Sequence, residues 1–287
     1  MTAVAYRPVR KLLSHQVRWV TVLTVGAALY AAVLTALLGT GDILYVPSLL
    51  LLGAAIVPVT VVTFVGLQGR GLSVAQVAAV AALGGVLAIV IAGPLEYTAA
   101  REFGSLPTWI VGLVEEAAKL AVPAVILLWR KRSPLDGVIL GVAVGGCFAM
   151  LETMGYGFVA LLQSGGSLEG VTELLAVRSV FEPGGHAAWT GLAAAALFAV
   201  RGSRRRWLGW LRFFAVFAGV VWLHATWDSL GTERAYLTLG AVSFGLLMAA
   251  TWWLHRTRSG PESPPPAAPW AVREALADYV GVTGPGR

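Results

Sequence analysis

Long apolar runs dominate this chain, and most of them are long enough to cross a lipid bilayer as a helix. A transmembrane helix needs about 20 predominantly apolar residues. By that rule we place spans at residues 18–38, 43–66, 74–95, 107–129, 136–162, 186–200, 207–230 and 235–254. The sequence therefore predicts an all-α fold, a polytopic membrane helical bundle of about eight transmembrane helices.

The composition excludes an ordinary soluble domain, since 57% of the residues are hydrophobic and only 13% are charged. A net charge of +6 could in principle indicate nucleic-acid binding. The basic residues lie at the ends of the apolar runs, however, and form no continuous face. We therefore expect membrane lipid around the chain and no nucleic acid as a partner.

The positions of the basic residues predict the topology. Cytoplasmic loops of membrane proteins carry an excess of Lys and Arg. Eight spans with both termini in the cytoplasm place the following residues inside: Arg70, Arg130, Lys131, Arg132, Arg201, Arg204, Arg205 and Arg206. We expect a multi-pass protein of the cell membrane with this orientation.

Two domains follow from a single change in composition. Residues 1–255 form the transmembrane helical domain. After His255 the chain becomes rich in Pro, Ser and Ala, most clearly over residues 259–269. Such a segment cannot build a packed core, so we predict that residues 256–287 are a disordered, Pro-rich cytoplasmic tail.

The sixth span is short and begins at His186, directly after a Glu-Pro-Gly-Gly turn at residues 182–185. A broken or re-entrant segment is tolerated in a membrane where it lines a cavity. The segment before it, residues 163–185, is a lid, a substrate guide or only a connector.

Several ionisable residues lie inside the predicted spans. A charge at the bilayer centre costs about 2.5–3.5 kcal/mol even on the mildest scale, so these side chains must face each other, water or a metal. They are Glu115, Glu116, Lys119, Glu152 and Asp228, with His224 beside them.

The spacings indicate how these residues meet. Residues four apart share a helix face, which pairs Glu115 with Lys119 and His224 with Asp228. A rise of about 1.5 Å per residue brings these positions, with Glu152, to the outer half of the membrane. Glu115 and Lys119 alone could be a structural ion pair, but that interpretation leaves Glu116 without a partner.

In this order the residues resemble the PrsW-type intramembrane proteases, relatives of the CAAX-prenyl endopeptidase superfamily. The resemblance covers about residues 105–230, the protease-like core, and departs from the family pattern at Thr153, where Asn is expected. Its motifs are Glu115-Glu116-Ala117-Ala118-Lys119, Phe148-Ala149-Met150-Leu151-Glu152, His186, and His224-Ala225-Thr226-Trp227-Asp228.

The resemblance implies an intramembrane endopeptidase that cleaves a peptide bond in or beside the membrane. Because His186 and Asp228 lie close to the outer ends of their spans, we expect cleavage of a membrane-anchored protein near the outer face. Glu115 or Glu116 would activate water. The catalytic set would be Glu115, Glu116, Lys119, Glu152, His186, His224 and Asp228. A zinc ion would be held by Glu116, Glu152, His186 and His224, although a metal-free glutamate mechanism uses the same residues.

Two other classes of function stay open at this point. Buried acids with a lysine also occur in ion- or proton-coupled transporters, although transporters usually show internal repeats and none is visible here. A non-catalytic membrane scaffold would keep the fold without the chemistry.

The predicted topology is tested with reporter fusions. Fusions after residue 203 and after residue 168 are expected to report opposite sides of the membrane, the first of them cytoplasmic. Reports from the same side would show that the number of spans between the two positions is wrong.

Overall fold

The computed structural model describes residues 6–66, 72–129 and 133–258. By its contacts the chain divides into two units, Met1–Thr251 and Trp252–Arg287. Of the predicted tail at 256–287, residues 259–287 lie outside the described residues, and residues 256–258 are the end of a helix. The basic residues at 70 and 130–132 also lie outside the described residues.

The described residues form α-helices and two short 3-10 helices, which confirms the all-α prediction. In chain order these are α1 (Tyr6–Thr40), η1 (Ile43–Tyr45), α2 (Val46–Gly66), α3 (Val74–Phe103), α4 (Thr108–Lys119), α5 (Ala121–Trp129), α6 (Pro134–Gln163), α7 (Leu168–Phe181), η2 (Glu182–Gly184), α8 (His186–Gly202), α9 (Arg206–Asp228) and α10 (Glu233–Arg258).

Six helical segments are long and apolar enough to cross a membrane: Val17–Thr40, Ile43–Gly66, Val74–Phe103, Pro134–Gln163, Arg206–Asp228 and Glu233–Thr257. They correspond to six of the predicted spans, so a polytopic membrane bundle is confirmed. The predicted span at 107–129 is divided into α4 and α5 at Leu120, and the short sixth span is the 17-residue α8. Backbone hydrogen bonds continue through Leu120, whose N–H donates to the Glu116 carbonyl at 3.2 Å.

The segment between the fifth and sixth predicted spans contains a helix of its own, α7. Gly165 and Gly166 adopt positive φ angles of 65° and 95° and turn the chain back after α6. Val171 and Leu175 of α7 are then buried in a cluster with Leu49 and Leu50 of α2. The segment is therefore packed against the bundle by its apolar side chains.

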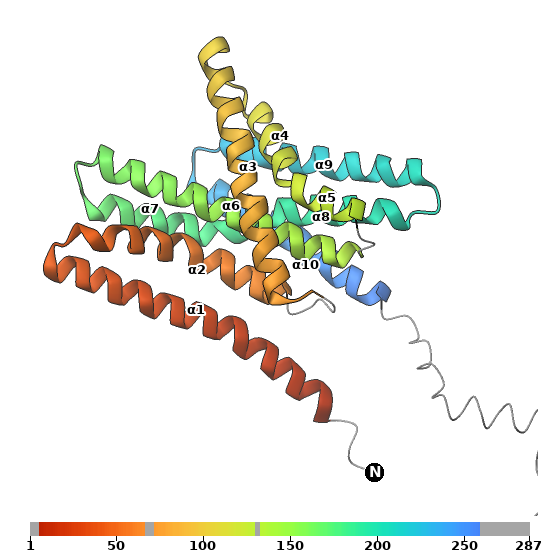
Figure 1. Cartoon of the computed structure of the whole chain (residues 1–287), viewed down its shortest axis with the longest axis horizontal. Helices are drawn as coiled ribbons and strands as arrows, with labels where there is room; N and C mark the ends of the chain where they lie inside the picture. The colour runs from red at the N-terminus through yellow and green to blue at the C-terminus, as the bar shows by residue number, and fades with distance from the viewer. Residues whose placement is uncertain (1–5, 67–71, 130–132, 259–287) are drawn as a thin grey trace, which may run out of the picture. The chain divides into compact units, whose positions relative to one another are not determined.

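α6 and α8 form the centre of the first unit. α6 packs against α2, α3 and α8, while α8 also packs against α9, and α4 packs against α3 and α9 (Figure 1). Trp189, Ile139 and Leu140 are among the largest fully buried side chains at this centre. The four helices that carry the predicted site, α4, α6, α8 and α9, are thereby brought together.

Three glycines of α6 let its backbone approach that of α8. Gly137, Gly141 and Gly145 are spaced four residues apart and lie on one helix face. A Cβ atom at each would overlap a carbonyl oxygen of α8, on Ala194, Thr190 and His186 respectively. Small residues at this spacing permit close helix packing in membranes. They fix the position of His186 relative to α6.

We predict that Gly141→Ala destabilises the folded protein by about 1–3 kcal/mol, because the added methyl group is forced into a tightly packed contact. The matched control is Gly155→Ala on the same helix, where a Cβ atom meets nothing within 4 Å. Thermal unfolding in detergent measures both variants. Equal melting temperatures would contradict the inferred close packing.

Candidate functional site

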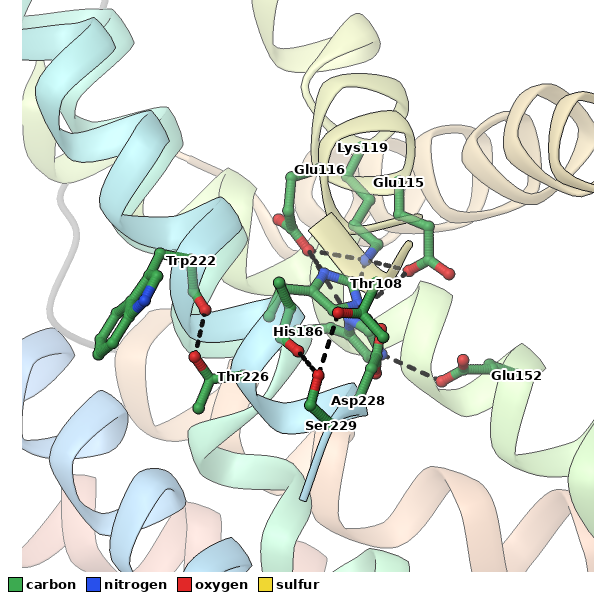
Figure 2. Close-up of polar contacts among 12 residues, drawn as sticks. Thr108, Glu115, Glu116, Lys119, Glu152, His186, Trp222, Thr226, Asp228 and Ser229 are labelled. Atoms are coloured by element: carbon green, nitrogen blue, oxygen red, sulfur yellow. Dashed lines mark hydrogen bonds and ion pairs between the residues drawn. The ribbon is translucent and has the colours of Figure 1, made fainter. Parts of the chain in front are cut away.

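Lys119 is the centre of a buried polar cluster. Its Nζ donates to Glu115 Oε2 at 2.9 Å, to Glu116 Oε1 at 2.8 Å and to His186 Nδ1 at 2.8 Å. The side chain is fully buried, and the Phe148 ring lies 3.9 Å from Nζ on another side. Figure 2 shows the three α4 side chains reaching toward His186 and Glu152. All three ammonium hydrogens thus have an acceptor.

The local structure of α4 explains this arrangement. Helical spacing places Glu115 and Glu116 one turn before Lys119, so both carboxylates reach one ammonium group, as the sequence predicted. Gly112 lets α4 approach α9, because a Cβ there would lie 3.2 Å from the Cβ of His224. At the start of α4 the Thr108 and Ser229 hydroxyls lie 3.0 Å apart. These contacts align α4 with the end of α9.

Glu116 has both carboxylate oxygens occupied by donors. Oε1 accepts from Lys119 and lies 3.1 Å from His224 Nδ1, and Oε2 accepts from the Thr190 hydroxyl at 3.0 Å. The residue is 0% exposed. A carboxylate held in this way orients its neighbours and has little capacity left to take a proton from water.

Glu115 differs from Glu116 in having an open oxygen. Its hydrogen bond within the described residues runs through Oε2, which accepts from Lys119. Oε2 also lies 3.6 Å from His224 Nε2 and 4.0 Å from His186 Nδ1. Glu115 is 6% exposed, so Oε1 is available in a mostly dry environment.

The contacts of His186 assign its tautomer. An ammonium group has no lone pair, so His186 Nδ1 must accept the hydrogen bond from Lys119. Nε2 then carries the proton and donates to Glu152 Oε2 at 3.0 Å. Glu152 therefore fixes the ring with Nδ1 pointing at the cluster.

His224 is held in a corresponding way from another helix. Its Nδ1–H donates to Glu116 Oε1, which leaves Nε2 to face Glu115 Oε2, with Asp228 Oδ2 3.5 Å away. The indole of Trp189 stacks on the ring at 4.8 Å between centroids. Each histidine is thus oriented by a carboxylate on one side. The second nitrogen of His224 faces Glu115, and that of His186 accepts from Lys119.

Arg178 of α7 completes the site from a segment outside the long helices. Its NH2 group donates to Glu152 Oε2 at 2.6 Å and its Nε donates to Thr153 Oγ1 at 2.7 Å. The guanidinium carbon lies 4.6 Å from the centroid of the Tyr156 ring. Thr153, the position that departs from the family pattern, is therefore the hydroxyl acceptor for the arginine that neutralises Glu152.

The structure brings all seven predicted site residues into one cluster, with Asp228 at its more exposed edge. Reasoning from the sequence missed Thr190 and Arg178. Thr190 lies one helical turn after His186, and this spacing could have indicated it. For Arg178 no spacing rule applies, because its partner Glu152 lies 26 residues away on another helix.

Glu115, His186 and His224 form a group that can hold a metal ion, with one ligand atom from each lying within 4.8 Å of the others. Two imidazoles and a carboxylate suit catalytic zinc. The sequence predicted Glu116 and Glu152 as further ligands. In the structure they accept hydrogen bonds from the ring N–H groups of His224 and His186 and lie outside this group of three. Such carboxylates commonly orient zinc-binding histidines.

The Lys119 ammonium already donates hydrogen bonds to two possible ligand atoms of this group, Glu115 Oε2 and His186 Nδ1. A cation bound through those atoms would repel the ammonium at short range. The donor set therefore fits a metal only if Lys119 shifts or loses its proton.

Comparison with known families agrees with the site. A family model described as PrsW family intramembrane metalloprotease matches residues 47–254, a stretch that includes every residue of the cluster. No curated protein and no solved structure matches the chain.

Removing the central cation should expose the cost of its buried partners. We predict that Lys119→Met destabilises the protein by about 3–5 kcal/mol, because Glu115 and Glu116 are left as uncompensated buried charges. Adding Glu116→Gln to Lys119→Met should recover part of this loss, and a double-mutant cycle from thermal unfolding measures the coupling. Strictly additive effects would contradict the inferred ion pair.

Proposed function

The chain belongs to the PrsW family of intramembrane metalloproteases, and on this premise we propose that Glu115 activates the water that cleaves a membrane-anchored protein. The protein is an intramembrane endopeptidase by its family. One observation carries the choice of base: Glu115 has an open carboxylate oxygen, whereas Glu116 has none.

The proposed reaction is hydrolysis of a peptide bond without a nucleophilic side chain. Water adds to the carbonyl carbon while its proton passes to Glu115 Oε1. The same proton then moves to the amide nitrogen as the carbon–nitrogen bond breaks, leaving a carboxylic acid and an amine, and proton transfer between these products gives a carboxylate and an ammonium group. Burial of Glu115 at 6% exposure keeps competing solvent away from this transfer.

The remaining residues position the reacting groups. Lys119 balances the charge of Glu115 and Glu116, and its three hydrogens are all engaged. Glu116 and Glu152 hold the rings of His224 and His186. His224 Nε2 lies between Glu115 Oε2 at 3.6 Å and Asp228 Oδ2 at 3.5 Å. In the doubly protonated form of the ring this nitrogen would donate to the carbonyl oxygen of the substrate.

We propose that zinc, when bound, is held by Glu115, His186 and His224. Its chemistry would be that of a Lewis acid, which polarises the scissile carbonyl. The metal group among the described residues and the name of the family both support this assignment.

We further propose that the substrate is cleaved close to the outer face of the membrane. α8 begins at His186 and α9 ends at Asp228, so both residues lie at helix termini. With both chain termini in the cytoplasm, these ends face outward. A continuous helix hides its peptide carbonyls in its own hydrogen bonds, so an extended segment beside a single transmembrane helix is the suitable substrate.

Activity is tested by comparing the membrane proteins of cells that contain the wild type or Glu115→Gln. We predict that the variant lowers cleavage by about 10²–10⁴-fold, because it removes the proton acceptor. Adding His224→Ala should cause little further loss, since residues that act as a unit are not additive. The matched control is Glu169→Gln, which changes an exposed acid of α7.

The same preparations distinguish the competing interpretations. The metal content of purified wild type, compared with that of Glu115→Gln, reports zinc binding independently of activity. Full cleavage by Glu115→Gln would overturn the role given to this residue. A substrate set unchanged in any variant would favour a scaffold, and altered ion flux without cleavage would favour a transporter.

A further inference from the structure

A cavity of about 460 Å³ lies beside the catalytic cluster, between α7 and the ends of α8, α9 and α10. His186 is one of its lining residues, so the cavity reaches a ring that also contacts Lys119 and Glu152. Its size is that of a small-ligand or side-chain pocket. Any group bound in it would lie directly next to the proposed reaction centre.

Aromatic side chains form one wall of this cavity. Phe181 contacts Trp227 and Tyr236, with ring centroids 6.1 Å and 5.8 Å apart, and Trp227 contacts Tyr236 at 4.8 Å. Trp189, which also lines the cavity, contacts Trp227 at 5.7 Å and stacks on His224. Aromatic pairs of this kind make a stiff apolar surface, which suits a large apolar side chain.

One residue of the cavity lining carries a polar atom without a partner. Glu182 is 8% exposed, and its Oε1 is buried without a hydrogen-bond partner among the described residues. A buried acceptor without a donor costs free energy and calls for an explanation. The nearby guanidinium of Arg178 donates instead to Glu152 and Thr153.

A peptide in extended conformation offers both complementary groups. It projects side chains to alternate sides, and its backbone N–H groups are free to donate. The aromatic wall, Glu182 and His186 all line the same cavity. An extended segment bound there would therefore lie beside α7 and reach His186.

We propose that this cavity binds the extended substrate segment next to the scissile bond. A large apolar side chain packs on Phe181 and Trp227, and the Glu182 carboxylate turns toward the cavity so that Oε1 accepts from a backbone N–H of the substrate. The cavity then selects which bond is cleaved. This inference rests on the proposed protease function and assigns it a specificity site.

The test uses full-length protein carrying Glu115→Gln, reconstituted in lipid vesicles, and a lipid-anchored, biotin-tagged peptide with Ala, Leu or Phe at one variable position. The photo-reactive residue p-benzoylphenylalanine replaces Val177, which lines the cavity, or Val180, which does not and is 65% exposed. We expect crosslinks from position 177 and few from position 180. The Leu and Phe peptides should crosslink about tenfold more than the Ala peptide.

Two variants examine the two halves of the pocket. Phe181→Ala should reduce the preference for Leu over Ala several-fold, with Val180→Ala as the matched control on the same turn of α7. Glu182→Leu should weaken binding of the Leu peptide several-fold. The same peptide, N-methylated at the amide that donates to Glu182, should bind the wild type as weakly as the unmethylated peptide binds Glu182→Leu. Binding of the methylated peptide should not weaken further in the variant.

Cleavage of the same peptides by the wild type separates this inference from the proposed function. Crosslinking that depends on side-chain size, without any cleavage, would support the cavity and count against the protease chemistry. Cleavage with equal crosslinking from positions 177 and 180, or with no dependence on the variable residue, would overturn the specificity site. An absence of crosslinks with every peptide would also overturn it.

Discussion

The buried ammonium of Lys119 is the interaction on which the site depends. Three carboxylates, those of Glu115, Glu116 and Glu152, face only two cations, Lys119 and Arg178. With His186 neutral, as its hydrogen bonds require, these groups have one negative charge in excess, and an ionised Asp228 at the edge of the cluster adds a second. An excess charge in a dry site is costly unless a proton or cation compensates it. The cluster is therefore poised to take up either one, which is what a general base or a metal site must do.

The packing of α6 on α8 turns this charge arrangement into a defined geometry. Gly145 allows the backbone of α6 to lie against His186, and two turns later Glu152 reaches the Nε2 of the same ring. α4 approaches α9 through Gly112 in the same way, which sets His224 beside Glu116. Backbone contact leaves no freedom for side-chain repacking to move the rings. The glycines thus act on the chemistry through helix spacing.

Much of this arrangement follows from the sequence, and the rest depends on details that spacing does not contain. Length and apolarity predict the spans, and helical periodicity predicts that Glu115 and Glu116 both reach Lys119. Which of the two glutamates keeps a free oxygen depends on Thr190 and His224, which come from other helices. The same limit applies to the proposed metal ligands, because sequence spacing does not distinguish a carboxylate that orients a histidine from one that could bind an ion. The sequence did not predict α7 as a helix, because its apolar residues are too few to span a membrane.

α7 connects the proposed substrate cavity to the proposed catalytic residues. It forms one side of the cavity that would hold the substrate, and its Arg178 holds Glu152, which in turn orients His186. A substrate packed on Phe181 would stabilise α7 in the position from which Arg178 reaches Glu152. Filling the cavity would thereby help to keep the ring of His186 aligned. The binding energy between the substrate side chain and the cavity would then serve both to select the substrate and to align the catalytic groups. This is expected where binding contributes to the rate of the chemical step.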